Sequence, residues 1–383
     1  MRARLPVVYR DGTHRAATPA ETLDRVRPWM AAMGITRVAD VTGLDRLGIS
    51  TWCAVRPAAR LIEIANGKGL SPISAEVSAI MEAIEDWHAE FPQGEFRNAS
   101  AGELRREGQA FVPAPELPLY RTDVHLTDRR AIDWVLGEQL PDGHPVWLPA
   151  SAIFLVEPML FDGDSNGLAS GNHIVEATLH ALYEVIERDA LGRLTRGGLI
   201  LPSEGSRAVN LETLPPGPLT LLRDRLREVE ISQILIRVES VAPISTFWAV
   251  LVDPTSPFAC TSVNFGQGSH LSPTVAALRA VTEAAQSRLT FIHGAREDLN
   301  EYSYEFLEVH QRVRAFFEGQ RGDCSWSEIA DPSGDDLSED LKAVLNGLCA
   351  AGHTRIYRVD LTNPRFGVPV VKVLVPGLLP MGF

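Results

Sequence analysis

The sequence lacks the patterns by which several classes of protein are recognised. Its four cysteines are scattered over 383 residues without a CxxC pair, so neither a disulfide framework nor a cysteine zinc site is expected. No apolar run reaches the roughly 18 residues of a membrane-spanning helix, and the N-terminus has no apolar signal region. These absences predict a protein of the reducing cytoplasm with no membrane association.

Basic sequence is also scarce. Lys and Arg number 36 against 49 Asp and Glu, the net charge is −13, and no run of Lys or Arg occurs. Because nucleic acids carry negative phosphates, a nucleic-acid partner is not expected. An apolar content of 45% with 22% charged residues is typical of a globular protein. Helical and strand-like segments alternate without an evident tandem repeat, which predicts an α/β or α+β fold.

Two familiar catalytic motifs are missing or incomplete. The chain has no GxxxxGK[ST] phosphate-binding loop, and ANGKGLS around Lys68 has the glycines and the lysine but not the spacing. That segment is either a phosphate contact or a simple turn. GDSNG at 163–167 matches GxSxG, in which Ser165 would be a hydrolase nucleophile if a strand preceded it and a helix followed it. The alternative for this segment is a glycine-rich turn.

The chain does contain acidic and polar side chains at helical spacing in three separate segments. The first segment is a predicted helix from Pro72 to Glu90, the second follows Gly171, and the third is AALRAVTEAAQSRLTFI. Spacings of three, four or seven residues return a side chain to the same helix face, here separate from an apolar stripe. The residues concerned are Ser78, Glu82 and Glu85; Asn172, Glu176, Glu184 and Glu187; and Arg279, Glu283 and Gln286.

Carboxylates gathered from distant segments would suit a hard cation such as Mg²⁺, and through it a polyphosphate. Arg279 lies one turn before Glu283 on the same face, where a guanidinium could contact phosphate. His180 shares the face of the second segment. The alternative is that these are the solvated faces of ordinary amphipathic helices. The first two segments contain no lysine for the usual Glu–Lys pairs, which argues against that alternative.

Five segments, in order, resemble the YcaO family. They are GKG near Lys68, SAxxSAxxEAIE, SNGLASGN, EAxxHALxEVIERDA and RAVTEAAQSR, and the resemblance covers most of residues 10–300. It is closest to the YcaO proteins that act with a TfuA-type partner, on the runs ITRVADVTGLDRLGI, RPAARLIEIANGKG and VPVVKVLVPGL.

The resemblance implies a YcaO-like fold, with mixed sheets packed by helices around a glutamate-lined cleft for ATP and Mg²⁺. It implies an N-terminal segment (1–65) contributing to the ATP site, a catalytic core (66–300) and a C-terminal segment of helix and strand (301–383). It places Glu82, Glu187 and Arg279 in catalysis. The implied metal ligands are Glu82, Glu85, Glu176, Glu184, Glu187 and Glu283, and the implied nucleotide contacts are Arg15, Thr22, Lys68, Ser78, Asn172, Arg188 and Arg279.

The activity implied is ATP-dependent phosphorylation of a peptide backbone amide. An external sulfur donor would then give a thioamide, whereas a Cys, Ser or Thr side chain of the substrate would give an azoline. The tail PGLLPMGF lacks the PxPxP ending common among azoline formers, and no fused peptide-recognition domain is visible. Both departures favour thioamide formation on a peptide or protein, with a TfuA-type partner, a sulfur donor and a homodimeric enzyme. The remaining alternative is an ATP-binding accessory protein without turnover.

Overall fold

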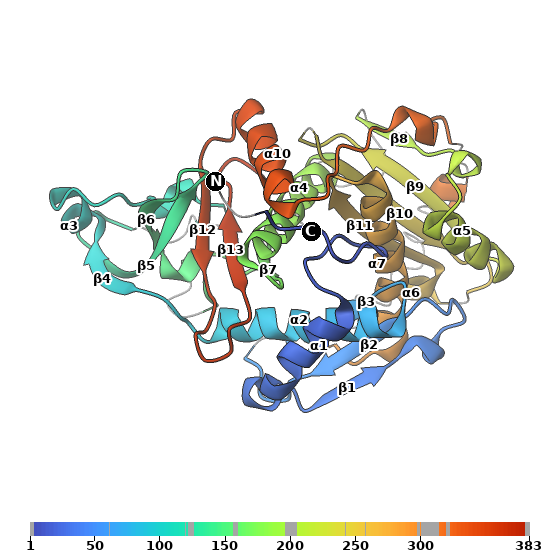
Figure 1. Ribbon diagram of the computed structural model, residues 1–383, viewed down its shortest axis with the longest axis horizontal. Helices are drawn as coiled ribbons and strands as arrows, with labels where there is room; N and C mark the ends of the chain where they lie inside the picture. The colour runs from blue at the N-terminus through green and yellow to red at the C-terminus, as the bar shows by residue number, and fades with distance from the viewer. Residues whose placement is uncertain are drawn as a thin grey trace.

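The structure is a computed structural model in which three antiparallel sheets each pack against one of three long helices (Figure 1). It describes residues 4–60, 62–118, 120–121, 126–155, 160–195, 205–241, 243–256, 258–296, 299, 314–318 and 322–379. The α+β architecture expected from the sequence is confirmed.

The sheets differ in size and in how much of the chain they gather. The first has the order β1-β2-β3, and the second has the order β11-β10-β9-β8. The third has the order β4-β5-β12-β13-β7, with β6 paired to β5, and so joins strands from both ends of the chain. The strands are β1 (Arg37–Asp40), β2 (Thr51–Val55), β3 (Ile64–Lys68), β4 (Phe96–Ser100), β5 (Ala131–Leu140), β6 (His144–Pro149), β7 (Leu168–Ser170), β8 (Ser206–Ala208), β9 (Ser232–Val238), β10 (Ser245–Val252), β11 (Val263–His270), β12 (Ile356–Asp360) and β13 (Val370–Leu374).

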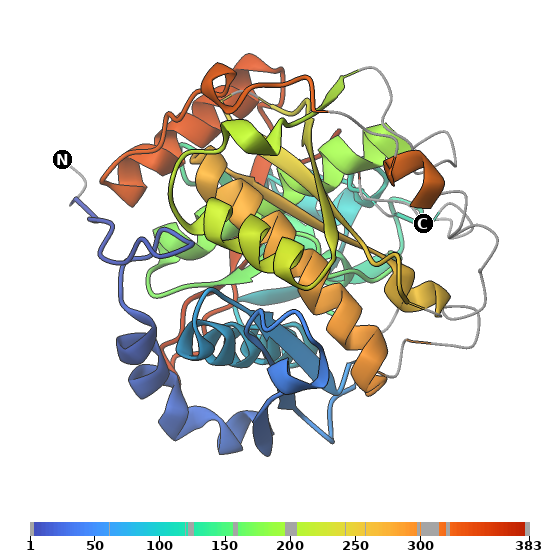
Figure 2. The same ribbon diagram turned by 90° about the vertical axis from the view of Figure 1, so that its right-hand side faces the viewer.

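Three long helices organise the core. Helix α2 packs on β2 and β3, α7 packs on β10 and β11, and α4 packs on β7 and β13. Figure 2 shows α5 and α7 on the outer side of the four-stranded sheet. The helices are α1 (Pro19–Val26), α2 (Pro72–Glu90), α3 (Ala101–Arg106), α4 (Ile174–Thr195), α5 (Pro218–Glu228), α6 (Ala259–Ser262), α7 (Pro273–His293) and α10 (Leu337–Ala350).

Helix α4 lies between two hydrophobic cores. Its side chains Leu182 and Ile186 are fully buried with those of β13 and α10. Further along the helix, Leu191 packs with Trp248 and Val250 of the four-stranded sheet. A helix that is buried on two sides has no wholly solvated face, so its polar side chains must find partners or a ligand.

Glycines explain how closely two of the long helices approach their sheets. A Cβ on Gly67 of β3 would lie 2.0 Å from the Ala79 nitrogen in α2, and a Cβ on Gly268 of β11 would lie 2.0 Å from the Ala276 oxygen in α7. Both distances are far below van der Waals contact, so any side chain there would displace the helix. Because successive strand residues alternate between faces, Lys68 points to the opposite face from Gly67.

Two local expectations from the sequence need correction. The segment ending in Asn66-Gly67-Lys68-Gly69 reads as a loop, yet Ile64–Lys68 forms β3, because Gly67 packs on a helix and not in a turn. The composition of the run FACTSVNF, with its aromatic and β-branched residues, predicts one strand, whereas Ala259–Ser262 is helical (α6) and β11 begins at Val263. Among the described residues, no helix is long and apolar enough to cross a membrane.

Candidate active site

One cleft of about 1350 Å³ contains every side chain that the sequence analysis named. It is bounded by the N-terminal segment, by β3 and β11, by the loop before β7, and by α2, α4 and α7. The structure therefore brings together residues that are up to 268 positions apart in the chain, from Arg15 to Glu283. The site residues on this lining are Arg15, Thr22, Lys68, Ser78, Glu82, Glu85, Asn172, Glu176, Glu184, Glu187, Arg188, Arg279 and Glu283.

The three long helices supply their cleft residues from the same positions. The helices begin at Pro72, Ile174 and Pro273, and the residues six, ten and thirteen places after these starts all line the cleft. Such positions lie on one helix face. No tandem repeat is evident in the sequence, and of these three positions only the one ten places after each start holds the same residue, glutamate, in all three helices. The three sets are Ser78, His180 and Arg279; Glu82, Glu184 and Glu283; and Glu85, Glu187 and Gln286.

The carboxyl groups of Glu82 and Glu187 resist ionisation. Burial, and then the nearby carboxylate of Asp86, raises the pKa of Glu82 to about 8. Burial, and then Glu283, raises the pKa of Glu187 to about 8 as well. Glu187 is only 4% exposed, and its Oε2 has no hydrogen-bond partner among the described residues. At neutral pH these carboxyl groups are therefore mostly protonated, and a bound cation would favour their ionised form.

Glu85 and Glu184 have protein partners of different strength. The backbone N–H and the hydroxyl of Ser170 donate to Glu85 Oε1 at 2.7 and 2.6 Å. Burial nevertheless raises the pKa of Glu85 to about 7. Among the described residues, Glu184 pairs with Arg188 in a long ion pair of 3.5 Å, and burial raises the pKa of Glu184 also. Glu85 thus links α2 to β7 by hydrogen bonds, while the oxygens of Glu184 can still accept further hydrogen bonds or coordinate a cation.

Glu283 has a lowered pKa, in contrast to the four glutamates above, and it contacts Lys68. Lys68 Nζ lies 2.7 Å from Glu283 Oε2, and the backbone N–H of Gln267 donates to the other oxygen at 3.3 Å. Burial opposes ionisation of Glu283, but the ammonium group outweighs burial and lowers the pKa of this carboxyl. The GKG segment therefore contributes a charged side chain to the site, as the phosphate-contact interpretation requires, and it is not merely a turn.

Arg279 is held by a histidine and not by a carboxylate. Its Nη2 lies 3.2 Å from Nε2 of His180, one turn before Glu184 on α4. The Nε atoms of Arg279 and Arg188 are buried and donate to no partner among the described residues. Unpaired guanidinium N–H groups lining a cleft are donors that an anionic oxygen would satisfy.

Glu176 attaches the N-terminal segment to α4. It accepts hydrogen bonds from Arg15 Nη1 at 3.2 Å, from the Ala16 nitrogen at 2.7 Å and from the Asn172 side chain at 3.2 Å. Thr22 in turn donates to Asn172 Oδ1 at 2.9 Å. Arg15, Thr22 and Asn172 therefore form one connected group. Both oxygens of Glu176 are therefore already occupied by protein donors, as are both oxygens of Glu283.

The donor set suits a hard cation, although the side chains have not closed around one. In the part of the chain that the structure describes, no three His, Cys, Asp or Glu side chains already converge as a metal-binding group. The unpartnered Oε2 of Glu187 and the raised pKa values of Glu82 and Glu187 are the features of carboxylates that gain from Mg²⁺.

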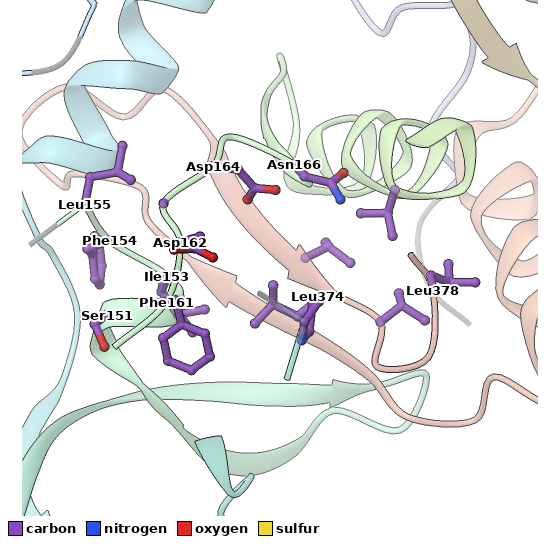
Figure 3. A pocket seen from close by; sticks show the side chains of 16 residues that line it. Ser151, Ile153, Phe154, Leu155, Phe161, Asp162, Asp164, Asn166, Leu374 and Leu378 are labelled. Atoms are coloured by element: carbon purple, nitrogen blue, oxygen red, sulfur yellow. The ribbon is translucent and has the colours of Figure 1, made fainter. Parts of the chain in front are cut away.

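A small pocket of about 30 Å³ adjoins the cleft (Figure 3), and the loop at Asp164, which lines both, is contacted by a lysine that the sequence analysis missed. The pocket shares Leu155, Gly163 and Asp164 with the cleft. The buried Lys372 of β13 donates to the Asp164 oxygen at 3.0 Å, and burial lowers the pKa of this lysine. In the sequence, the one lysine within the apolar run VPVVKVLVPG could have indicated a buried charged side chain here. Lys372 holds the loop that separates the two cavities.

The hydrolase interpretation of Ser165 is wrong. A nucleophile elbow places its serine between a strand and a helix. Ser165 instead lies in a loop, is followed by strand β7, and precedes the first residue of α4 by nine positions. The glycine-rich turn, which was the alternative interpretation, is what the structure contains.

Residues 66–379 match the family described as YcaO cyclodehydratases, which bind ATP and Mg²⁺. The chain belongs to the YcaO family. An uncharacterized protein of Mycobacterium tuberculosis (strain H37Rv) is 36% identical over 392 residues, covering 97% of this chain and 84% of its own length. A protein of Rhizobium leguminosarum bv. trifolii, described as lying in the tfuA 3′ region, is 32% identical over 386 residues, covering 95% of this chain and 88% of its own length.

Solved structures agree with this assignment. The YcaO protein of Methanopyrus kandleri, bound with AMPPCP and Mg²⁺, superposes with a TM-score of 0.77 at 25% identity, over 98% of this chain and 95% of its own. A heterocyclase in complex with substrate and cofactor has a TM-score of 0.80 at 22% identity, covering 99% of this chain and 54% of its own. The similarity to the heterocyclase shows that the two proteins share a fold. The YcaO-like fold expected from the sequence is confirmed, and ATP and Mg²⁺ are the cofactors of the family.

Proposed function

We propose that this YcaO protein uses ATP and Mg²⁺ to phosphorylate the oxygen of a peptide backbone amide, and that a sulfur donor then converts the amide to a thioamide. The observation that carries this proposal is the convergence of carboxylates and cationic side chains in one cleft. Neither set is satisfied internally, since Glu187 Oε2 and the Nε atoms of Arg188 and Arg279 lack described partners. A metal–polyphosphate complex would supply both missing partners.

We assign the glutamates to the metal and the remaining polar groups to the nucleotide. Lys68, Arg188 and Arg279 would neutralise phosphate charge, and Arg15, Thr22, Ser78 and Asn172 would position the rest of the nucleotide. The bound group supplies electrophilic phosphorus and the charge that makes an amide oxygen a competent leaving group. The metal ligands proposed are Glu82, Glu85, Glu176, Glu184, Glu187 and Glu283, with Glu176 first having to release donors from Arg15, Ala16 and Asn172.

The protein's own part in the reaction is positional and electrostatic. Carboxyl groups with raised pKa values, as at Glu82 and Glu187, would release their protons near neutral pH as they coordinate the metal. Residues 1–65 would complete the nucleotide end of the site, since Arg15 and Thr22 both line the cleft. No covalent protein nucleophile is required, because the nucleophile adds to the substrate carbon. A homodimer stays a prediction.

One observation supports thioamide formation with a TfuA-type partner: the Rhizobium relative is described as lying in the tfuA 3′ region. Azoline formation is the second candidate, and the cyclodehydratase description of the family and the heterocyclase structures favour it. Both candidates use the same ATP site and differ only in the source of the nucleophile.

Intact-mass analysis of a candidate precursor peptide decides among the candidates. The peptide is incubated with this protein, its TfuA-type partner, Mg·ATP and sulfide. A mass gain equal to the difference between sulfur and oxygen is expected for thioamide formation. Loss of one water would transfer the assignment to azoline formation. An unchanged peptide with ATP bound but not consumed would make the protein an accessory factor.

Matched variants tie the result to the cleft. Glu187→Gln removes a carboxylate at the centre of the site, and we expect it to abolish the mass change while the protein stays folded. Glu76→Gln serves as the control, because Glu76 is on α2 but does not line the cleft. Full activity of the Glu187→Gln protein would contradict the assignment of the site.

A further inference from the structure

The side chain that orients Arg279 is unusual for a site full of carboxylates. Lys68 pairs with Glu283, Arg188 pairs with Glu184, and Arg15 pairs with Glu176. Arg279 forms no ion pair with any described carboxylate. Its one described side-chain contact is from Nη2 to Nε2 of His180, at 3.2 Å. The neutralising arrangement used for the other three cations is therefore absent at Arg279.

The chemistry of this contact determines the state of the histidine. A guanidinium group can only donate, so Nε2 of His180 must be the ring nitrogen that carries the lone pair, with the proton on Nδ1. Burial, and then the charge of Arg279, lowers the pKa of His180 well below its usual value. His180 is thus a neutral acceptor. It occupies one N–H of Arg279 without cancelling the positive charge.

His180 and Arg279 occupy equivalent positions along their two helices. His180 is six residues after the first residue of α4, and Arg279 is six residues after the first residue of α7. Ser78 is at the same position of α2. Glu82, Glu184 and Glu283 each follow four residues later. Along their own helices, the Cα atoms of His180 and Arg279 are therefore about one turn, about 6 Å, from those of Glu184 and Glu283.

We infer that His180 is a positioning residue that fixes the plane of the Arg279 guanidinium and leaves its Nε to an anionic phosphate oxygen of the nucleotide. This inference rests on the proposed function. The buried Nε of Arg279, which has no described partner, is the donor that the phosphate would satisfy. A carboxylate in place of His180 would hold Arg279 equally well but would compete with the phosphate for its charge. A neutral imidazole holds the side chain without that competition.

A double-mutant cycle tests the inference through the affinity for Mg·AMP-PCP, measured by calorimetry. His180→Leu cannot accept a hydrogen bond, and we expect it to weaken binding about tenfold, as for the loss of one hydrogen bond to a charged group. His180→Gln retains an acceptor and should recover most of the affinity. In the Arg279→Ala background, His180→Leu should have no further effect, because its only proposed role is through Arg279. His144→Leu, at an exposed histidine outside the cleft, is the matched control.

The outcomes separate this inference from the proposed function. If the wild-type protein does not bind Mg·AMP-PCP, the proposed function fails and the inference fails with it. If the wild type binds but His180→Leu changes nothing, or weakens binding equally in both backgrounds, the inference alone is overturned. Equal behaviour of His180→Gln and His180→Leu would also overturn it, since an acceptor would then not be what matters.

Discussion

Binding of a magnesium nucleotide is expected to release protons from the cleft. Glu82 and Glu187 have pKa values of about 8, and Glu85 has a pKa of about 7. At pH 7 a group with the higher value is about nine-tenths protonated and one with the lower value about half protonated. These three carboxyls therefore hold about two protons in the ligand-free protein. A carboxyl must ionise before it coordinates Mg²⁺, so we expect about two protons to leave on binding.

The same linkage makes affinity depend on pH. Each released proton increases the apparent affinity by up to about tenfold per pH unit, so between pH 6 and pH 7 the gain approaches about 100-fold. The dependence flattens above pH 8, where the carboxyls are ionised before the ligand arrives. Glu187→Gln removes one of the titrating groups. This variant should bind more weakly and release about one proton fewer at pH 7.

Calorimetric titration with preformed Mg·AMP-PCP in buffers of different ionisation enthalpy measures the number of protons released. Protons contributed by the ligand itself cancel when the wild type is compared with Glu187→Gln. Glu76→Gln, a carboxylate of the same helix as Glu82 but outside the cleft, should match the wild type. Tight wild-type binding without proton release would refute the reasoning, as would an unchanged proton count in Glu187→Gln.

Three further predictions follow from contacts in the structure. Without ligand, the free energy of unfolding should fall as pH rises. Carboxyls whose folded pKa is raised stabilise the fold fully below pH 4.5 and lose that contribution as pH passes about 7 to 8. Urea unfolding at pH 5, 6.5 and 8 measures this free energy, and a rise with pH would contradict the prediction. Lys68→Met should raise the pKa of Glu283 and weaken nucleotide binding about tenfold or more. The control Lys342→Met, at an exposed lysine of α10, should leave nucleotide affinity unchanged. Equal affinities of the two variants would rule out a role for the Lys68–Glu283 pair. Gly67→Ala would place a Cβ 2.0 Å from the backbone of Ala79 and should lower the free energy of unfolding by about 3 kcal/mol or more. The control Gly43→Ala would place a Cβ with no atom within 4 Å. In the same urea assay it should change the free energy of unfolding by less than about 0.5 kcal/mol.

The sequence predicted the membership of the site far better than its internal arrangement. Helical periodicity is local, so the faces of α2, α4 and α7 could be read from residues within a few turns of one another. The helix from Pro72 to Glu90 has the boundaries that its pattern predicts. By contrast, the spacing shared by the three helices is hidden in the sequence, because equivalent positions hold residues as different as Ser78, His180 and Arg279.

Strand β3 shows why a local pattern can mislead. Glycine and lysine in NGKG are typical of a turn, and within the segment itself nothing contradicts a turn. The strand forms because α2 packs against its backbone at Gly67, where a Cβ would meet Ala75 and Ala79. That requirement comes from a neighbouring element. The same contact directs Lys68 toward Glu283, 215 residues away, and so creates a functional residue from an apparent loop.

The sequence by itself predicted which carboxylates would meet: six glutamates on the faces of three helices, a donor set that suits a cation and a polyphosphate. Only the tertiary structure decided what each would do. Glu187 and Glu283 are both glutamates on cleft-facing helix positions, yet the pKa of the first is raised and that of the second is lowered. The difference arises because Lys68 contacts only Glu283, and ionisation responds to charges and burial that the fold brings from distant parts of the chain.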